Sequence, residues 1–220
     1  MTGVIIPALN AAQTLGKLLE RIEPHTSLGG IVVVDDGSTD GTASIAREAG
    51  AKVLRHEVNR GKGAALRTAF AYVLASTNFN DVITLDADLQ HDPREIPRFM
   101  ECRSHTGADL IIGVRKRLGS GMPLHRILSN MLTSRLVSAR SGVRIDDSQS
   151  GFRLISRSVL SALTVESDGF EAETEILLKA ARKGFEIRGI PIATIYAGTA
   201  SHMTHWNTTV GFLHTLLREY

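Results

Sequence analysis

Residues 82–93 decide the fold of this chain, and they read Val-Ile-Thr-Leu-Asp-Ala-Asp-Leu-Gln-His-Asp-Pro. The apolar, β-branched start is typical of a buried strand, which then ends abruptly in Asp86, Asp88 and Gln90. Such a strand delivers two carboxylates and an amide oxygen to its carboxyl end. Oxygen ligands of this kind suit a hard divalent cation that faces an anionic group, so the stretch predicts an enzyme.

A second strand strengthens this prediction. A lone Asp-x-Asp is weak evidence, because Asp is common where a strand gives way to a turn. Residues 31–34, however, are also apolar and are followed by Asp35 and Asp36. Carboxylates gathered at one edge of a sheet repel one another, and a cation, a base or ribose hydroxyls would offset this cost. The two strand ends together indicate a ligand site at that edge.

Short apolar runs alternate with helical patterns through the first half of the chain. Continuous apolar strands are covered on both faces, and helices between them imply parallel pairing. We therefore predict an α/β fold, a doubly wound, Rossmann-like, mostly parallel sheet within a single domain. The expected strands are residues 4–6, 31–34, 52–55, 82–85 and 110–113.

The second half is less regular, and acceptor-side elements often lie in such a region. We expect a helix over residues 124–139, a tight segment over 146–153 and a helix near 171–182 that Gly184 stops. A strand pair around residues 187–195 is interrupted by Pro191.

Helix-end signals support this division. Apolar spacing predicts a helix over residues 14–22, and a second helix over 42–49 is closed by Gly50 in a left-handed cap. After the acidic strand, Asp92 is typical of an N-cap, Pro93 of the first helical position and Glu95 of a capping box. We assign Asp92 to capping rather than to chemistry.

Composition narrows the function classes. The 220 residues carry a net charge of +2 and scattered basic residues, whereas a nucleic-acid binder would more often show a dense basic face. The single cysteine, Cys102, excludes an internal disulfide and fits a reducing cytoplasm. There is no apolar run of the roughly 18 residues that span a membrane, and no signal peptide is evident.

Three basic positions are candidates for binding an anion. Lys62 lies in a glycine-rich turn, residues 59–63, whose following helix could face an anion; a plain loop with a solvated lysine is the alternative. Arg115 follows a strand end, where a guanidinium makes forked contacts to phosphate. Arg126 and Ser129 begin a helix and are candidates for a second anionic group, although a surface position also explains Arg126.

Further candidates lie in the second half. Asp147 begins a segment rich in small residues that suits close approach to a ligand. Glu171 and Glu173 either favour a helix N-terminus electrostatically or take part in catalysis. His202 and His205 have a spacing that helical zinc ligands also show, but no Cys or third clustered His supports zinc.

Taken together, the motifs resemble glycosyltransferase family 2 with the GT-A fold, in particular its dolichyl-phosphate or polyprenyl-phosphate mannosyltransferase branch. The resemblance runs from about residue 4 to residue 191, and the order of the motifs is its strongest feature. The matching segments are residues 6–10, 34–42, 59–63, 86–93, 113–115 and 147–153.

The resemblance implies a nucleoside diphosphate sugar donor, held in a half of about residues 1–115, and an acceptor half of about 116–220. Asp86, Asp88 and Gln90 would hold Mg²⁺ or Mn²⁺ on the diphosphate, and Arg115 would contact the leaving phosphate or the acceptor. Inverting transfer is expected. The other residues expected around the substrates are Pro7, Asn10, Asp36, Lys62, Ala87, Arg126, Ser129 and His202, the last near the place of a family lysine.

The acceptor decides which residues are catalytic. A lipid phosphate is already an anionic nucleophile, and Arg115, Arg126 and Ser129 would orient it. A sugar hydroxyl needs a base, for which Asp147 is the first candidate and Glu171 the second.

Four hypotheses remain open at this point. The leading one is metal-dependent, inverting transfer of a hexose to a polyprenyl phosphate, and the runner-up is transfer to a saccharide or other hydroxyl in envelope or exopolysaccharide synthesis. A sugar-phosphate nucleotidyltransferase would release pyrophosphate instead, and a non-catalytic binding module need not keep a full metal set. We expect a cytoplasmic chain, which a lipid acceptor would bring to the inner membrane face or to a membrane-protein partner.

Overall fold

A seven-stranded sheet organises the computed structural model, which describes residues 1–26, 30–116, 124–193, 211–212 and 214–218, the side chains of 124–126 excepted. The strand order is β3-β2-β1-β4-β6-β5-β7. Only β6 runs antiparallel to its neighbours, so the predicted mostly parallel α/β sheet is confirmed. The strands are β1 (Thr2–Ala8), β2 (Ile31–Asp35), β3 (Lys52–Arg55), β4 (Asp81–Thr84), β5 (Leu110–Arg115), β6 (Arg153–Ser156) and β7 (Ile187–Ile192).

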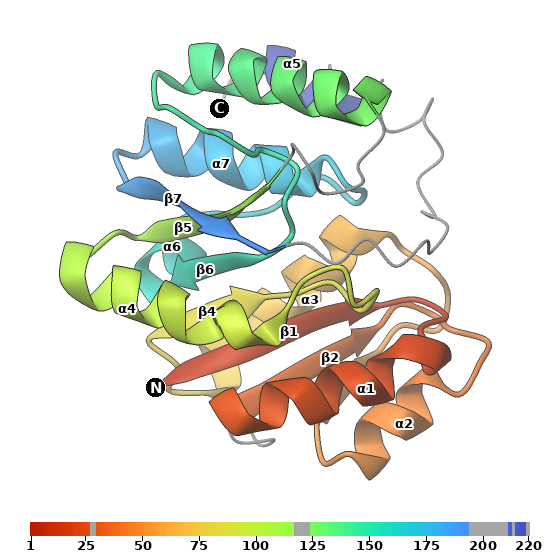
Figure 1. Ribbon diagram of the computed structural model, residues 1–220. Coiled ribbons are helices and arrows are strands. Elements are labelled where there is room, and N and C mark those ends of the chain that lie inside the picture. Colours follow the sequence, from red (N-terminus) through yellow and green to blue (C-terminus); the bar gives the residue numbers. More distant parts are fainter. Residues whose placement is uncertain (27–29, 117–123, 194–210, 213, 219–220) are drawn as a thin grey trace.

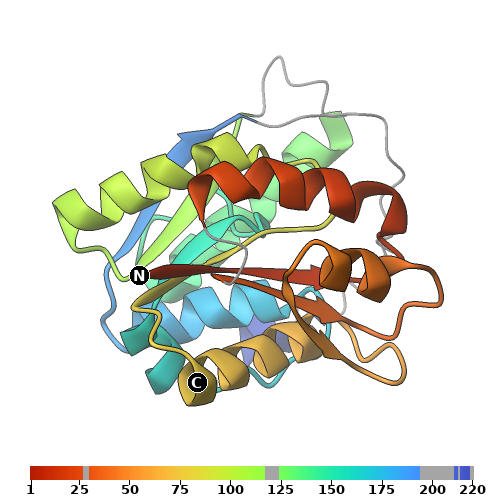
Figure 2. The ribbon, with the colours of Figure 1, turned by 90° about the horizontal axis from the view of Figure 1, so that it is seen from below.

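Helices cover both faces of this sheet (Figures 1 and 2). One apolar cluster joins one sheet face to α1, α2 and α4, and a second joins the other face to α3, α5, α6 and α7. Consecutive strand residues alternate between the clusters, since Val4 and Ile6 lie in one and Ile5 in the other. The helices are α1 (Ala12–Ile22), α2 (Thr42–Glu48), α3 (Lys62–Ser76), α4 (Ile96–Thr106), α5 (Leu124–Ser141), α6 (Arg157–Ala162) and α7 (Ala172–Arg182).

Strand β6 was not predicted, and among the strands of the described residues it alone reverses direction. The chain returns from α5 to the carboxyl edge before β6 begins, so that Arg153 pairs with Thr84 and Ser156 pairs with Asp81. It fills the space between β4 and β5 and continues the buried sheet with four buried residues.

The predicted strand pair at residues 187–195 is wrong, because residues 187–192 form one strand. Pro191 lies inside β7 opposite Val114 of β5. Since β7 is the edge of the sheet and pairs with β5 alone, a residue without an N–H is tolerated there.

Helix ends follow the sequence signals with one exception. Gly50 and Gly184 have φ of 81° and 78°, as left-handed caps require. Asp92 accepts a bond from Arg94 N at 3.1 Å and caps a short 3₁₀ turn, Pro93–Glu95, that leads into α4. The capping-box role of Glu95 is wrong, since its carboxylate instead binds Arg98 at 2.5 Å and Ala193 N at 3.1 Å.

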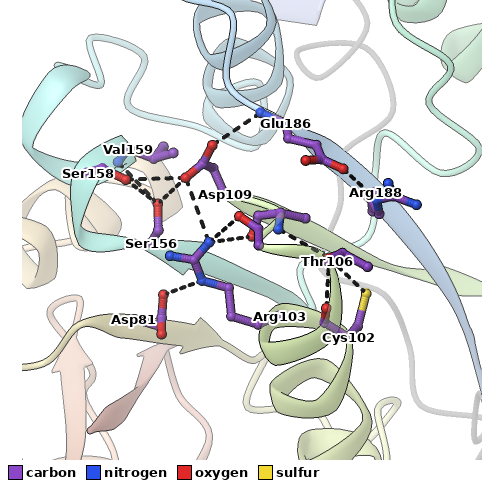
Figure 3. A network of polar contacts seen from close by, with 12 residues as sticks. Asp81, Cys102, Arg103, Thr106, Asp109, Ser156, Ser158, Val159, Glu186 and Arg188 are labelled. Carbon is purple, nitrogen blue, oxygen red and sulfur yellow. Dashed lines mark hydrogen bonds and ion pairs between the residues drawn. The ribbon is translucent and has the colours of Figure 1, made fainter.

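A polar network ties the amino-end edge of the sheet together (Figure 3). Arg103 of α4 donates to Asp81 at 3.0 Å and to the carbonyl oxygens of residues 107 and 108. Asp109 accepts from Ser156 at 3.4 Å and from Glu186 N at 3.2 Å. We call the group Asp81, Arg103, Asp109, Ser156 and Glu186 the amino-end clasp.

Near the end of the described chain, residues 211–212 and 214–217 are helical. Phe212 and Leu216 are buried in the core. Leu217, which follows them, is 78% exposed. Over the described residues, helices that combine the length and the hydropathy of a membrane span are absent.

Candidate active site

The carboxyl edge gathers charged side chains from four elements. Asp86 follows β4, Lys62 begins α3, Arg115 ends β5 and Glu173 lies in the first turn of α7. Pro7 of β1 lines a small internal cavity together with Lys62, Asp86 and Glu173. The sheet therefore brings residues separated by more than 160 positions to one place.

Lys62 is the centre of a three-residue charge cluster. Its ammonium lies 2.5 Å from Asp86 Oδ1 and 2.6 Å from Glu173 Oε1, and its side chain is only 13% exposed. Burial opposes the charged form of Lys62, yet the two carboxylates raise the pKa of its ammonium above the ordinary value. The solvated lysine considered from the sequence is therefore wrong, and Lys62 acts as a fixed cation beside Asp86.

Asp86 stays ionised because of this neighbour. Burial alone would raise the pKa of its carboxyl, but the charge of Lys62 outweighs burial and lowers that pKa. Gly151 lets the chain pass close by, since a Cβ there would lie 2.5 Å from Asp86 Oδ2. Thr84 fixes this crossing by donating to the Gly151 carbonyl at 2.7 Å.

Asp88 lies in a tight turn directly after Asp86. Its Oδ1 accepts the backbone N–H of Gln90 at 2.9 Å, and Leu89 between them has a φ of 63°, which is unusual for a non-glycine residue. Burial first and the negative charge of Asp86 second raise the pKa of the Asp88 carboxyl. A strained backbone and two repelling carboxylates are unfavourable unless a ligand relieves them. Such features are found mainly at functional sites.

His91 lies behind this turn. Its ring is 4% exposed and packs against Phe152 at a centroid distance of 5.4 Å. Burial lowers the pKa of His91 to about 4, so the ring is neutral at pH 7. Its Nδ1 has no hydrogen-bond partner within the described part of the chain. From the sequence, His91 was assigned a structural role where the strand turns into the helix, and its burial could not be read from the motif.

Arg115 and Asp147 form a forked ion pair. Arg115 Nε lies 2.8 Å from Asp147 Oδ2, and Arg115 Nη2 lies 2.9 Å from Asp147 Oδ1. The Asp147 side chain is 1% exposed, and it also accepts the Arg115 backbone N–H at 3.2 Å. Asp147 therefore fixes the orientation of Arg115. The catalytic role of Asp147 stays a prediction.

The glycine-rich turn is not a free anion site. Gly63 N and Ala64 N, at the start of α3, donate to the carbonyl oxygen of Asp168 at 2.7 and 3.2 Å. A Cβ at Gly61 or Gly63 would collide with the backbone of residues 167–168. The prediction that this helix N-terminus faces an anion is wrong for the described structure, because a loop from the second half caps it.

Asp36 also has protein partners. Its carboxylate accepts the N–H groups of Arg60 and Gly61 at 2.9 and 2.8 Å, and it lies 2.6 Å from His56 Nδ1. Asn10 has a φ of 50°, and its Oδ1 accepts Thr39 N at 2.9 Å. These bonds shape the loops after β1 and β2, and the expected contacts of Asn10 and Asp36 to the substrates stay predictions.

The remaining predicted residues differ in how far the structure describes them and in their burial. Ala87 is buried within the Asp-Ala-Asp turn, and Ser129 is exposed on α5. Arg126 lies in α5, but its side chain is not described. His202 lies outside the described residues. The expected acceptor cluster therefore stays a prediction for these positions.

Arg153 was quoted in a motif but given no role. Its guanidinium is 2% exposed and donates to the carbonyl oxygens of Ser148, Ser150 and Glu173 at 2.8, 2.8 and 2.6 Å. It therefore holds the 148–150 segment against α7. A lone arginine after Gly-Phe does not reveal such burial, so the sequence alone could not assign it.

The oxygen donors of the turn are of the kind that Mg²⁺ or Mn²⁺ takes. The Lys62 ammonium already satisfies one Asp86 oxygen as a cation would, and the repulsion that raises the pKa of Asp88 would be relieved by a second positive charge. Among the described residues, no group of three or more His, Cys, Asp and Glu side chains is gathered for a metal. An ion would thus need Gln90, water or ligand oxygens beside Asp86 and Asp88.

Comparison with known proteins agrees with this geometry. A model of glycosyl transferase family 2 matches residues 3–164. A dolichyl-phosphate hexose transferase of Haloferax volcanii is 32% identical over 86% of this chain and 80% of its own length. A polyprenol monophosphomannose synthase of Mycolicibacterium smegmatis is 30% identical over 87% of this chain and 76% of its own length.

Among solved structures, glucosyl-3-phosphoglycerate synthase of Mycobacterium tuberculosis, in complex with Mn²⁺, UDP and glucosyl-3-phosphoglycerate, has a TM-score of 0.77 at 23% identity. The match covers 99% of this chain and 78% of that one. It confirms the expected GT-A fold. The matching family model, the named relatives and this fold together show that the chain belongs to glycosyl transferase family 2 and is a glycosyltransferase.

Proposed function

We propose that this glycosyltransferase moves a hexose from a nucleoside diphosphate sugar to a polyprenyl phosphate, with inversion and with a divalent metal. The observation that carries the proposal is the strained turn at Asp86 and Asp88, whose paired carboxylates lie beside the fixed cation Lys62. The names of the dolichyl- and polyprenyl-phosphate relatives support the acceptor class, and the Mn²⁺ and UDP of the structural neighbour support the donor and the metal.

In this proposal, Asp86, Asp88 and Gln90 would hold Mg²⁺ or Mn²⁺, and the bound ion would neutralise charge on the donor diphosphate. Lys62 keeps Asp86 ionised and oriented, and Arg115 is aimed by Asp147. Pro7, Asn10 and Asp36 shape the edge where we expect the base and ribose. Lys62 and Arg115 thereby place fixed positive charge where negative charge grows on the leaving nucleoside diphosphate.

The transfer step makes one bond and breaks one. An oxygen of the acceptor phosphate attacks the anomeric carbon from the face opposite the diphosphate, while the bond from that carbon to the diphosphate oxygen breaks. The leaving nucleoside diphosphate takes the electron pair, and the sugar carbon becomes oxocarbenium-like between the two. Attack from the opposite face inverts the anomeric configuration.

A phosphate acceptor fits the state of Asp147. A hydroxyl acceptor needs a carboxylate to take its proton, and the first candidate, Asp147, is buried in a forked pair with Arg115. A phosphate is already ionised at neutral pH and needs orientation instead, for which we propose Arg115 with Arg126, Ser129 and His202. A saccharide acceptor, with Glu171 as base, is the second candidate.

The test incubates the protein with Mn²⁺ or Mg²⁺ and a panel of UDP- and GDP-sugars, with and without polyprenyl phosphate. We expect a nucleoside diphosphate to appear only when metal and lipid phosphate are both present, and the product linkage, measured by NMR, to be inverted relative to the donor. Release of pyrophosphate would reject the proposal in favour of nucleotidyl transfer. Equal release with a soluble saccharide in place of the lipid would favour the second candidate.

A further inference from the structure

The two carboxylates that bind the Lys62 ammonium differ in depth. Lys62 Nζ lies 2.5 Å from Asp86 Oδ1 and 2.6 Å from Glu173 Oε1, so it is shared almost equally between them. The Asp86 side chain is 27% exposed, whereas that of Glu173 is 8% exposed. Asp86 is therefore the outer partner of Lys62, and Glu173 is the inner partner.

A divalent ion on Asp86 would meet the ammonium at the same oxygen. The other oxygen, Asp86 Oδ2, faces the backbone of Gly151, where a Cβ would lie 2.5 Å from it. An ion bound at Oδ1 would have the Lys62 charge directly beside it, and two positive charges so close repel strongly in a partly buried site. The ion and Lys62 would thus compete for Asp86.

The inner side of the cluster has room and charge for the ammonium. A cavity of about 10 Å³ is lined by Lys62, Asp86 and Glu173 among others, and one water-sized group such as an ammonium needs this much space. Arg153 Nη1 fixes the backbone of Glu173 by donating to its carbonyl oxygen at 2.6 Å. The ring of Phe170 lies 5.7 Å from Lys62 Nζ, within the range of a cation–π contact. The ammonium can therefore leave Asp86 and still be stabilised.

We propose that Glu173 is a positioning residue for the metal, because it takes the Lys62 ammonium when a divalent ion binds Asp86. Lys62 is then a built-in competitor of the ion, and Glu173 relieves the competition. This inference rests on the proposed function, since it requires that Asp86 holds a divalent ion.

A purely structural role of Glu173 makes a different prediction. Glu173 lies in the first turn of α7, where a carboxylate favours the helix electrostatically. If this were its whole contribution, replacing it would change stability and leave the affinity for a metal ion as it is. Metal affinity therefore separates the two roles, independently of turnover.

The test is a titration of the purified chain with Mn²⁺, without donor or acceptor, in which electron paramagnetic resonance measures the free ion. Lys62→Met should bind Mn²⁺ about tenfold more tightly than the wild type, because the competing charge is gone. Glu173→Gln should bind it about threefold more weakly, because the ammonium then stays on Asp86. Opposite effects of two residues in one cluster cannot result from a general loss of stability.

The matched controls make the same charge changes in the amino-end clasp, at the other edge of the sheet. Arg103→Met and Asp81→Asn should bind Mn²⁺ like the wild type. Cooperative thermal unfolding of each variant shows that the fold is kept. If Lys62→Met does not fold, the double variant with Glu173→Gln takes its place, and it should bind Mn²⁺ more tightly than Glu173→Gln alone.

A crystal of the wild type soaked with Mn²⁺ gives the direct readout. We expect Lys62 Nζ to contact Glu173 and no longer Asp86. An ion on Asp86 with the ammonium still on both carboxylates would overturn the proposal, and so would equal Mn²⁺ affinity of Lys62→Met and the wild type.

Failure of this inference differs from failure of the proposed function. Metal-dependent transfer without any effect of Lys62 or Glu173 on Mn²⁺ affinity would reject only the competition. The expected Mn²⁺ affinities without release of nucleoside diphosphate would reject only the proposed reaction. Mn²⁺ binding by none of the variants would overturn both.

Discussion

The two ends of strand β4 use the same residue types to opposite effect. Asp81 at its start belongs to the amino-end clasp, where Arg103 binds it at 3.0 Å (Figure 3). Asp86, just past its end, lies 2.5 Å from Lys62. Each aspartate pairs with a cationic side chain, and the two pairs have different surroundings.

At the amino end, the protein itself supplies the partners. Arg103 spreads its donors over Asp81 and two carbonyl oxygens, and Asp109 joins Ser156 to the start of β7. Such satisfied networks fix the relative positions of strands and helices. We infer that the clasp contributes stability and takes no part in the reaction.

At the carboxyl end, the chain leaves unfavourable features in place. Asp88 has a raised pKa beside Asp86, Leu89 is left-handed, and His91 Nδ1 and Ser150 Oγ lack partners among the described residues. Proteins break local rules mainly where function needs it. The comparison therefore predicts that changes at the two ends of β4 affect different quantities.

The largest effect should follow Asp88→Asn. Loss of a metal-holding carboxylate should lower kcat/KM by about 10³-fold or more, roughly 4 kcal/mol of transition-state stabilisation. Stability should stay equal or rise, because the repulsion from Asp86 is removed. Transfer assays measure kcat/KM, Mn²⁺ titration measures metal binding, and urea unfolding measures stability.

Asp81→Asn is the matched control at the other end of the strand. It should lower stability and leave kcat/KM within about twofold of the wild type, as expected for a residue remote from chemistry. If Asp88→Asn turned over normally, the metal assignment would be lost. If Asp81→Asn were inactive yet folded, the division between the two ends would be wrong.

Lys62→Met tests the charge cluster. It leaves the buried Glu173 and the partly buried Asp86 without their cation, and we expect a loss of about 3 kcal/mol in the free energy of unfolding. Adding Glu173→Gln should recover part of this loss, because one unpaired charge disappears. Urea unfolding of the wild type, the two single variants and the double variant gives the coupling energy. Additive losses would show that Lys62 and Glu173 are not energetically coupled.

Asp109→Asn should have a smaller effect, confined to stability. The variant weakens the bonds to Ser156 and Glu186 N, and we expect a loss of about 1–2 kcal/mol with unchanged kcat. Hydrogen exchange should show the change at the start of β5 and β7. A fall in kcat without such local opening would contradict the structural role of the clasp.

Much of the fold could be predicted because local patterns determine it. The five strands of the first half were read from short apolar runs, and the caps at Gly50, Asp92 and Gly184 from single residues. Strand β6 and the edge position of Pro191 could not be predicted, because they depend on which strands become neighbours in the sheet. That information is in no single segment.

The candidate site also has one part that could be predicted from the sequence and another that could not. The Asp86 and Asp88 turn was read directly, since both carboxylates lie in one motif. The pairing of Lys62 with Glu173, 111 positions later, was missed because only the folded chain brings them together. The same holds for the Asp168 carbonyl that caps α3, which no sequence signal at residues 59–63 could reveal.

The smallest predicted effect concerns Glu175, which supports the functional edge from behind. Its carboxylate accepts the N–H groups of Glu166 and Ser167, both at 2.8 Å, and so holds the loop whose Asp168 carbonyl caps α3. Burial would raise the pKa of Glu175, but Lys179 and these donors lower it below its ordinary 4.5. A carboxyl with a lowered folded-state pKa stabilises the protein fully above the ordinary value, and this contribution is lost as pH falls through the folded-state pKa. Glu175→Gln should therefore be about 1 kcal/mol less stable than the wild type near pH 7, and the difference should vanish in acid. Urea unfolding at a series of pH values measures it, and a difference independent of pH would show that the contribution of Glu175 comes from packing rather than from its charge.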